Sequence, residues 1–409
     1  MIFGAANSFA AIYLLSRGYT NSQIGLILAL GNVFAVMVQP FMGDLGDRSK
    51  RLTVFNIMEG MGILLAVLMA LLFIQKESSL ALAITYMMTV GWIRILEPFC
   101  NALNGKMEER GAMINFGACR SVGSLCYALL TALLGVLVEK LGTDVLPIAG
   151  EIVTLLFLLS VVLVSKTFAG MKGDGKDRTA SRGNGYMEER TTVTPEEANG
   201  RTAASHQNND INLKEFIKRH PMFLFLSLGI LGLFYGNNTV NIYMAQITAA
   251  VGGDSSDTGR IFSMLAFMEI PTMLLFSRIN RRFPCRKLLK FSAVAFVFWI
   301  GSCTLAGTVA TLMAAQIFQA FGFALFLPAV VKFIGDTMEK GEAIKGQTTF
   351  TAVATAGGIF ASLLGGVILD LGGAKMLTAF GTIITIVGAV TVLLYVDKAE
   401  KEGLRYGTE

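Results

Sequence analysis

Residues 52–75 read LTVFNIMEGMGILLAVLMALLFIQ and contain a single charged side chain, that of Glu59. A helix needs about 20 mostly apolar residues to cross a bilayer, so this stretch predicts a transmembrane helix. Similar runs recur along nearly all of the 409-residue chain, which is 53% hydrophobic and only 15% charged. Soluble domains carry roughly 25% charged residues. The composition therefore excludes a soluble protein and indicates a polytopic, all-helical membrane protein.

Apolar runs separated by polar breaks predict twelve membrane spans. We expect the spans near residues 1–16, 21–41, 52–75, 80–103, 114–138, 145–165, 221–248, 258–278, 287–307, 310–334, 345–369 and 374–396. The first run is short and begins at Met1 without a basic leader, so it resembles neither a signal peptide nor a full crossing. Two explanations stay open: a start further upstream, or a thin first helix.

The distribution of lysine and arginine predicts the orientation of the spans. Of the 34 such residues, the loops after odd-numbered spans hold only Arg17, Lys76, Lys140, Arg260 and Lys375. Arg94 and Arg120 fall deep inside spans, and all the others lie in loops after even-numbered spans, at the span ends that border those loops, or in the C-terminal tail. Basic loops remain in the cytoplasm. We therefore expect a plasma-membrane protein with both termini in the cytoplasm.

The longest polar break, at residues 166–220, predicts a flexible cytoplasmic linker. It separates two expected six-helix bundles, at residues 1–165 and 221–397, and residues 398–409 form an expected cytoplasmic tail. The two halves repeat one another in register: Ile12-Tyr13 recurs as Ile242-Tyr243, Pro98 as Pro328, Leu133-Leu134-Gly135 as Leu363-Leu364-Gly365, and Asp47-Arg48 as Asn280-Arg281. An even number of spans separates the copies, so both keep one orientation. This pattern is typical of a parallel repeat about an axis along the membrane normal.

The loop between the second and third spans reads Gly43-Asp44-Leu45-Gly46-Asp47-Arg48-Ser49-Lys50-Arg51. This loop, the two parallel halves and the long central break resemble the major facilitator superfamily, whose signature is G-x-x-x-D-R/K-x-x-R/K. The resemblance implies the major facilitator fold and transport by alternating access. It also implies a cytoplasmic latch, made in the outward-facing state, from Gly43, Asp47, Arg48 and Arg51. Spacing alone equally allows an orientation signal.

A segment of span 5, Phe116-Gly117-Ala118-Cys119-Arg120-Ser121-Val122-Gly123-Ser124, is similar to the F/Y-G-x-x-R-x-x-G-S segment of the lactose-permease-like branch. That branch includes oligosaccharide and nucleoside proton symporters, and the resemblance implies a role in sugar recognition for Arg120. The charged residues that the permease carries in spans 9 and 10 are missing from the aligned stretches, Phe298-Trp299-Ile300-Gly301 and residues 316–322. Any proton coupling here must therefore use other groups.

Charged residues within spans are expensive and usually face the bundle interior or a wet cavity. The candidates are Glu59, Arg94, Glu97, Arg120 and Glu269. Arg94 and Glu97 share one helix face, and they either bind substrate or form a structural pair. Arg120 offers five hydrogen-bond donors, which suit paired hydroxyls, a carboxylate or a phosphate of a substrate. The alternative to substrate binding is a structural ion pair between Arg120 and Glu97.

Glu269 is the acidic residue deepest in a C-terminal span, and Pro271 follows it closely. A proline inside a span frees a backbone carbonyl, and burial favours the protonated form of a carboxyl group. We therefore expect Glu269 to be the proton-coupling residue. The alternative is a permanently protonated glutamate that bonds a neighbouring helix.

Uncharged polar and aromatic side chains complete the expected substrate site. The amides assigned to it are Asn237, Asn238, Asn241, Gln316 and Gln319. Each amide taken singly is more often a bond between helices than a ligand contact. Trp92 and Trp299 either stack on a sugar or base, or face lipid.

The leading interpretation is a monomeric secondary transporter that imports a small polar solute, of sugar or nucleoside type, together with protons. Proton-driven drug efflux is the alternative within this class, although the G-x-x-x-G-P-x-x-G-G signature of drug antiporters is not visible in span 5. A non-transporting receptor or scaffold is the alternative from another class. The sequence shows no catalytic motif and no metal-ligand spacing, so we expect no enzyme, cofactor, metal site or nucleic-acid partner.

Overall fold

The computed structural model describes the chain except for residues 49–52, 110–115, 171–212, 339 and 407–409. The described part contains helices and no strands. The N-terminal half holds η1 (Gly4–Ser8), α1 (Ala10–Ser16), α2 (Asn21–Arg48), α3 (Val54–Ile74), α4 (Leu80–Glu109), α5 (Phe116–Leu141) and α6 (Val145–Gly170). The C-terminal half holds α8 (Leu213–Arg219), α9 (Pro221–Ile242), α10 (Met244–Ala250), α11 (Ser255–Arg282), α12 (Cys285–Leu305), α13 (Val309–Ala315), α14 (Ile317–Phe321), α15 (Phe323–Thr337) and α16 (Lys340–Tyr406).

These helices fit the twelve expected spans. Among the described residues, 10 helical stretches are long and apolar enough to cross a membrane. The first crossing is divided between the π-helix η1 and α1, so it is not one of the 10. α16 supplies two crossings because its chain turns at Gly373, where φ is 69°. A left-handed φ is easily adopted only by glycine, and this turn lies within the predicted break between spans 11 and 12.

Helices extend beyond two of the predicted domain boundaries. α6 continues to Gly170, and α8 lies inside the stretch predicted as a linker. α16 continues to Tyr406, through residues expected to form a tail. Hydropathy marks where a helix leaves the apolar core, whereas Lys, Glu and Arg are good helix formers that prolong a helix into water.

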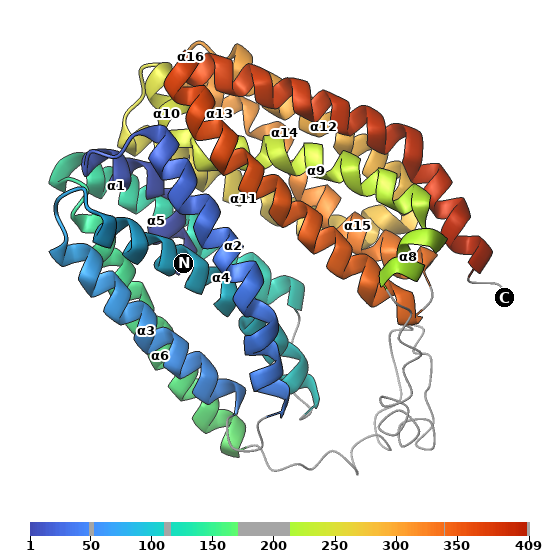
Figure 1. Cartoon of the computed structure of the whole chain (residues 1–409), viewed down its shortest axis with the longest axis horizontal. Coiled ribbons are helices and arrows are strands. Elements are labelled where there is room, and N and C mark those ends of the chain that lie inside the picture. Colours follow the sequence, from blue (N-terminus) through green and yellow to red (C-terminus); the bar gives the residue numbers. More distant parts are fainter. Residues whose placement is uncertain (49–52, 110–115, 171–212, 339, 407–409) are drawn as a thin grey trace.

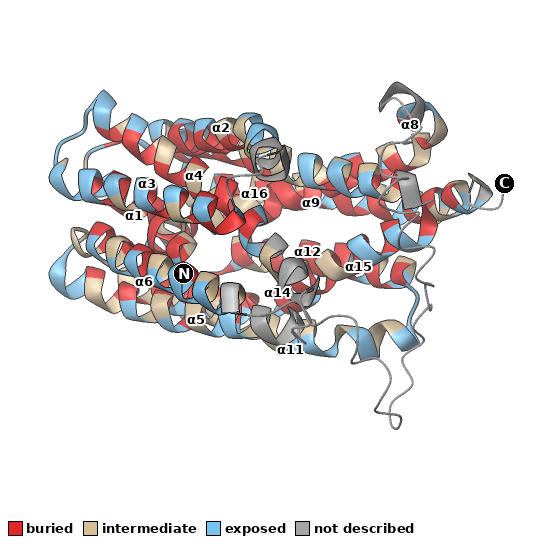
Figure 2. Ribbon diagram, turned by 90° about the horizontal axis from the view of Figure 1, so that it is seen from below, coloured by how far each residue is buried: buried red, intermediate tan, exposed pale blue. Residues whose placement is uncertain are grey.

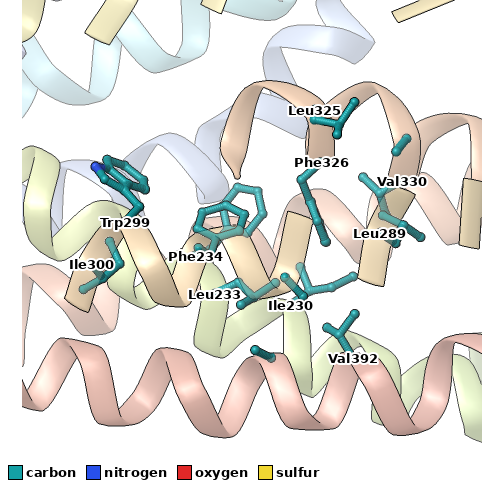
Figure 3. Packing of buried hydrophobic residues seen from close by; sticks show 14 of the residues in the cluster. Ile230, Leu233, Phe234, Leu289, Trp299, Ile300, Leu325, Phe326, Val330 and Val392 are labelled. Carbon is teal, nitrogen blue, oxygen red and sulfur yellow. The ribbon is translucent and has the colours of Figure 1, made fainter. Parts of the chain in front are cut away.

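Each half has its own apolar core. In the C-terminal bundle, rings from α9, α12 and α15 pack together, including Phe234, Trp299 and Phe326 (Figure 3). A separate cluster fills the N-terminal bundle and includes Phe9, Tyr13 and Tyr86. Exposed residues line the outside of both bundles (Figure 2), and many of them are large and apolar. Such a surface suits lipid rather than water as the solvent.

The two bundles meet along two pairs of helices, α5 with α11 and α2 with α16, which we call the α5–α11 seam and the α2–α16 seam. In Figure 1 the bundles adjoin at the end that carries α1, α10 and α13, and α2 diverges from α16 toward the opposite end. We call the first the joined end and the second the linker end.

Candidate functional site

Two glycines allow the helices of the α5–α11 seam to touch near the joined end. A Cβ atom on Gly135 would lie 2.8 Å from the Ser255 carbonyl oxygen and 2.9 Å from the Cα of Gly259. No side chain larger than hydrogen fits there without displacing backbone. This contact sets how closely the polar groups further along α5 and α11 approach one another.

The α2–α16 seam is closed by a carboxylate from the opposite bundle. Asp370 of α16 accepts hydrogen bonds from the backbone and side chain of both Asn21 and Ser22, at 2.5 to 3.3 Å. Asn21 and Ser22 begin α2, so Asp370 satisfies N–H groups that a helix start leaves unpaired. Gln246 of α10 adds a bond of 3.0 Å to the Asn21 side chain. The joined end is thus fastened by polar contacts between the bundles.

Glu269 lies about 15 Å along α11 from Gly259, at 1.5 Å per residue, on the side of Pro271 nearer the joined end. Its side chain is half-buried. The Gln319 amide donates a hydrogen bond of 2.7 Å to the Oε1 atom of Glu269. The structure therefore brings together the predicted coupling residue and one of the predicted binding amides.

Gln319 occupies an interrupted crossing. Span 10 was expected as one helix, but it consists of α13, α14 and α15, with breaks at Gln316 and Gly322. Gly322 has a ψ of −94°, outside the helical region. Only 1% of Gln319 is exposed. The breaks let two glutamines three positions apart point to different helices.

The N-terminal bundle presents hydroxyl groups toward the same region. Tyr127 of α5 and Ser8 of η1 share a hydrogen bond of 2.7 Å. Gly4 makes room for the phenol ring, because a Cβ there would lie 3.1 Å from Tyr127 Cδ2. The Tyr127 hydroxyl is within electrostatic range of Glu269 across the α5–α11 seam. Tyr127 and Glu269 thus interact electrostatically from opposite bundles.

Arg94 and Glu97 of α4 form the ion pair that their spacing predicts, with 3.9 Å between Nη1 and Oε2. The guanidinium also lies 4.8 Å from the centre of the Phe3 ring. Its Nε atom is buried without a hydrogen-bond partner, whereas the Glu97 side chain is 57% exposed. The pair thus has an accessible carboxylate and one unused buried donor.

The expected site amides of α9 bind their own helix. Asn238 donates to the Phe234 carbonyl at 2.8 Å, and Asn241 donates to the Asn237 carbonyl at 2.9 Å. These bonds back to the preceding turn occupy donors that a ligand would need. In this conformation Asn238 and Asn241 donate to their own helix, and the ligand role of the three asparagines stays a prediction.

Gln316 does not lie beside Glu269. Its side chain is fully buried in the C-terminal core, where it accepts a hydrogen bond of 3.0 Å from the Trp299 indole and donates to the Leu312 carbonyl. The expectation that Gln316 lines the substrate site is not supported here, and Trp299 neither faces lipid nor is open to a ligand. Trp92 stacks on Phe34, with ring centres 6.0 Å apart.

The comparisons with known proteins identify the family. The model of the MFS_1 like family matches residues 2–380. The chain belongs to the MFS_1 like family. This match confirms the superfamily resemblance of residues 43–51 and makes the chain a membrane transporter rather than an enzyme. No curated protein sequence matches the transporter.

Solved structures confirm the fold of the transporter. A crystal structure of the nucleoside transporter NupG is similar with a TM-score of 0.65 and 13% identity, covering 96% of this chain and 94% of that one. The POT family transporter PepTSo gives a TM-score of 0.68 and 11% identity, covering 98% of this chain and 95% of that one. A bacterial homologue of the human drug peptide transporters PepT1 and PepT2 gives a TM-score of 0.67 and 15% identity, covering 98% of this chain and 96% of that one. The narrower resemblance to the lactose-permease-like branch stays a prediction.

Several predicted residues of the transporter fall outside the description. Arg51 lies outside the described residues. The helices α2 and α5 are described, but the surroundings of Gly43 and the side chains of Asp47, Arg48 and Arg120 are not. Sequence reasoning missed Tyr127 and Asp370. Tyr127 follows Arg120 by two helical turns and so shares its face of α5, a signal that was available. Asp370 had no such signal, because its partners lie in the other bundle.

Proposed function

We propose that this chain is a proton-coupled importer of a small polar solute, of sugar or nucleoside type. The observation that supports the proposal best is the hydrogen bond between Glu269 and Gln319, which lies within the membrane-spanning helices and within electrostatic range of Tyr127 of the other bundle. A carboxyl group within a span is a candidate for proton loading and release. A group between two moving bundles can bind its proton from either side of the membrane.

The proposed orientation follows from the basic loops. If the loops rich in lysine and arginine are cytoplasmic, the linker end faces the cytoplasm. The structure, with its bundles adjoined at the other end, then represents an inward-facing state of a plasma-membrane protein. We propose that residues Gly43, Asp47, Arg48 and Arg51 form the cytoplasmic latch of the outward-facing state.

The proposed substrate contacts are Arg120 and the pair of Arg94 and Glu97, with the asparagines of α9 contributing after rearrangement. A guanidinium binds hydroxyls or a carboxylate through a planar pair of donors. Lysine keeps the charge but loses this geometry, so Arg120→Lys should weaken uptake at low solute concentration. Unchanged uptake by this variant would remove Arg120 from substrate recognition.

The decisive experiment measures uptake into proteoliposomes from a panel of sugars, nucleosides, dipeptides and lipophilic cations, with and without an imposed pH gradient. We expect one sugar or nucleoside to accumulate only when the gradient is present. Transport of lipophilic cations alone would favour drug efflux and overturn the import proposal. If none of these solutes is transported, the result would support a receptor or scaffold.

Glu269→Gln tests the coupling residue. The amide cannot ionise, so we expect accumulation driven by the pH gradient to be lost while exchange of labelled for unlabelled solute continues. Asp336→Asn is a matched control, because Asp336 pairs with Lys332 on α15 at an exposed position. Full accumulation by Glu269→Gln would show that another group couples the proton.

A further inference from the structure

Only one of the two polar atoms of the Gln319 side chain has a hydrogen-bond partner. Its Nε2 atom donates to Glu269, but its carbonyl oxygen is buried and has no hydrogen-bond partner. The neighbouring Gln316 differs, because its oxygen accepts from Trp299 and its nitrogen donates to Leu312. A buried acceptor without a donor carries the full desolvation cost of that group. The Gln319 carbonyl therefore lacks a donor beside a carboxyl group.

A protonated carboxyl group supplies the missing donor. An ionised carboxylate only accepts hydrogen bonds, whereas the acid form also donates through its O–H. The acid and the amide then match each other: the amide N–H binds the acid carbonyl oxygen while the acid O–H binds the amide carbonyl. The first of these two parallel bonds is already present at 2.7 Å.

The titratable groups on the helices around this pair lie on α5, α11, α12 and α15. Helices α10, α13 and α14 carry no titratable side chain, and those of α15, Lys332 and Asp336, pair with each other. Helix α12, which packs against α14, carries Cys285, Arg286, Lys287, Lys290 and Cys303. The remaining titratable groups on α5 and α11 are Cys119, Arg120, Cys126, Tyr127, Glu139, Lys140, Asp257, Arg260, Arg278, Arg281 and Arg282. Of these, Tyr127 is within electrostatic range of Glu269.

We propose that Gln319 is a positioning residue for the transported proton, whose carbonyl oxygen accepts the O–H of protonated Glu269. The proton comes from water and leaves to water, and no covalent bond between heavy atoms changes. This inference rests on the proposed function of Glu269 and assigns its partner in the proton-loaded state. Loss of the proton leaves the Gln319 carbonyl unsatisfied and weakens the contact between α11 and α14. Proton binding by Glu269 thereby strengthens the contact between α11 and α14, which is part of the interrupted tenth crossing.

Infrared titration of the full chain tests this proposal without a known substrate. The carbonyl stretch of protonated Glu269 is followed as pH is raised, and the band is assigned by its loss in Glu269→Gln. Gln319→Met keeps the length of the side chain but removes both hydrogen bonds. We expect the acid to bind its proton about threefold to tenfold more weakly, a fall of roughly 0.5 to 1 in the midpoint pH. The acid carbonyl stretch should also move to higher frequency, because the acid loses its hydrogen bonds.

Gln316→Met is the matched control, since it removes an equally buried amide from the same crossing. This variant should lower thermal stability without changing the midpoint pH at which the Glu269 acid band titrates. If Gln319 served only as a donor to the carboxylate, its loss would raise the midpoint, and that result or an unchanged midpoint would overturn the proposal. If Gln319→Met does not fold, the wild-type band decides: the frequency of a doubly bonded acid supports the ring, and that of a free acid overturns it. Accumulation by Glu269→Gln tests the proposed function separately.

Discussion

At the scale of the residue, the environment of each polar group decides its role more than its type does. Gln316 and Gln319 are three positions apart in one apolar run, yet one stabilises a core tryptophan and the other binds a carboxyl group. Arg94 and Arg17 are both partly buried cations, but Arg17 lies in a loop and pairs with Asp144 at 2.5 Å. Local partners therefore separate structural charges from candidate transport residues.

Asp144 should make the stability of the transporter depend on pH. The hydrogen bond from Arg17 holds the pKa of the Asp144 carboxyl below its usual value. A lowered folded-state pKa stabilises the fold above the unfolded pKa, near 3.9, and this stabilisation is lost as pH falls through the folded value. The Asp144 side chain is 43% exposed, so solvent screening limits the effect to about 1 kcal/mol or less.

Thermal unfolding of wild type and Asp144→Asn at several pH values measures this contribution. The wild type should be the more stable of the two near pH 6, and the difference should vanish in acid below the folded pKa. A difference that stays constant down to strong acid would show that Asp144 stabilises the fold by other means.

At the scale of the element, helix breaks and glycine contacts determine which faces meet. The breaks around α14 turn Gln319 toward α11 and leave Gln316 in the core. Gly135 and Gly259 bring α5 and α11 together, so that Tyr127 and Glu269 lie within electrostatic range of each other. Neither feature changes hydropathy, and each decides the geometry of the site.

Gly259→Ala should strain the α5–α11 seam. The added Cβ would lie 2.8 Å from the Cα of Gly135, and overpacking of this kind costs about 1–3 kcal/mol. We therefore expect a lower unfolding temperature for the purified protein. Gly60→Ala in α3 is the matched control, because a Cβ there meets no atom within 4 Å; it should be neutral or slightly stabilising. Equal stability of the two variants would mean that the seam opens at no cost.

At the scale of the whole molecule, hydrogen bonds between the bundles at the joined end stabilise the observed arrangement. Asp370 and Gln246 bind the start of α2 from the other bundle, and the bundles separate toward the linker end (Figure 1). An equilibrium between two such arrangements shifts only through contacts that differ between them. The contacts of Asp370 are of this kind.

Asp370→Asn should shift the population away from the observed arrangement. In the wild type, donors of Asn21 and Ser22 bond to both carboxylate oxygens of Asp370. The asparagine side chain replaces one of these oxygens by an N–H group and carries no charge, so the charge-assisted bonds are lost. At this exposed position we expect a change of about 1 kcal/mol, or about fivefold in population. Spin labels at Met37 of α2 and Ile344 of α16, both exposed, report the distance at the linker end in a cysteine-free background.

The label distances should include a larger share of short values in Asp370→Asn than in the wild type. Asp336→Asn removes an exposed carboxylate that pairs with Lys332 on its own helix, so it should leave the distribution unchanged. An identical distribution for Asp370→Asn would show that the glycine contacts alone keep the joined end closed.

The sequence by itself determined the solvent, the number of crossings, the two-bundle repeat and the family, because the lipid environment imposes apolar runs of fixed length. It also indicated Glu269 as a candidate for proton coupling, since a charge inside a span is costly. Only the tertiary structure decided that Glu269 meets Gln319, that Gln316 belongs to the core, and that Asp370 caps α2. These pairings join positions far apart in the chain. They depend on backbone breaks and close helix contacts, which the hydropathy pattern of the sequence does not reveal.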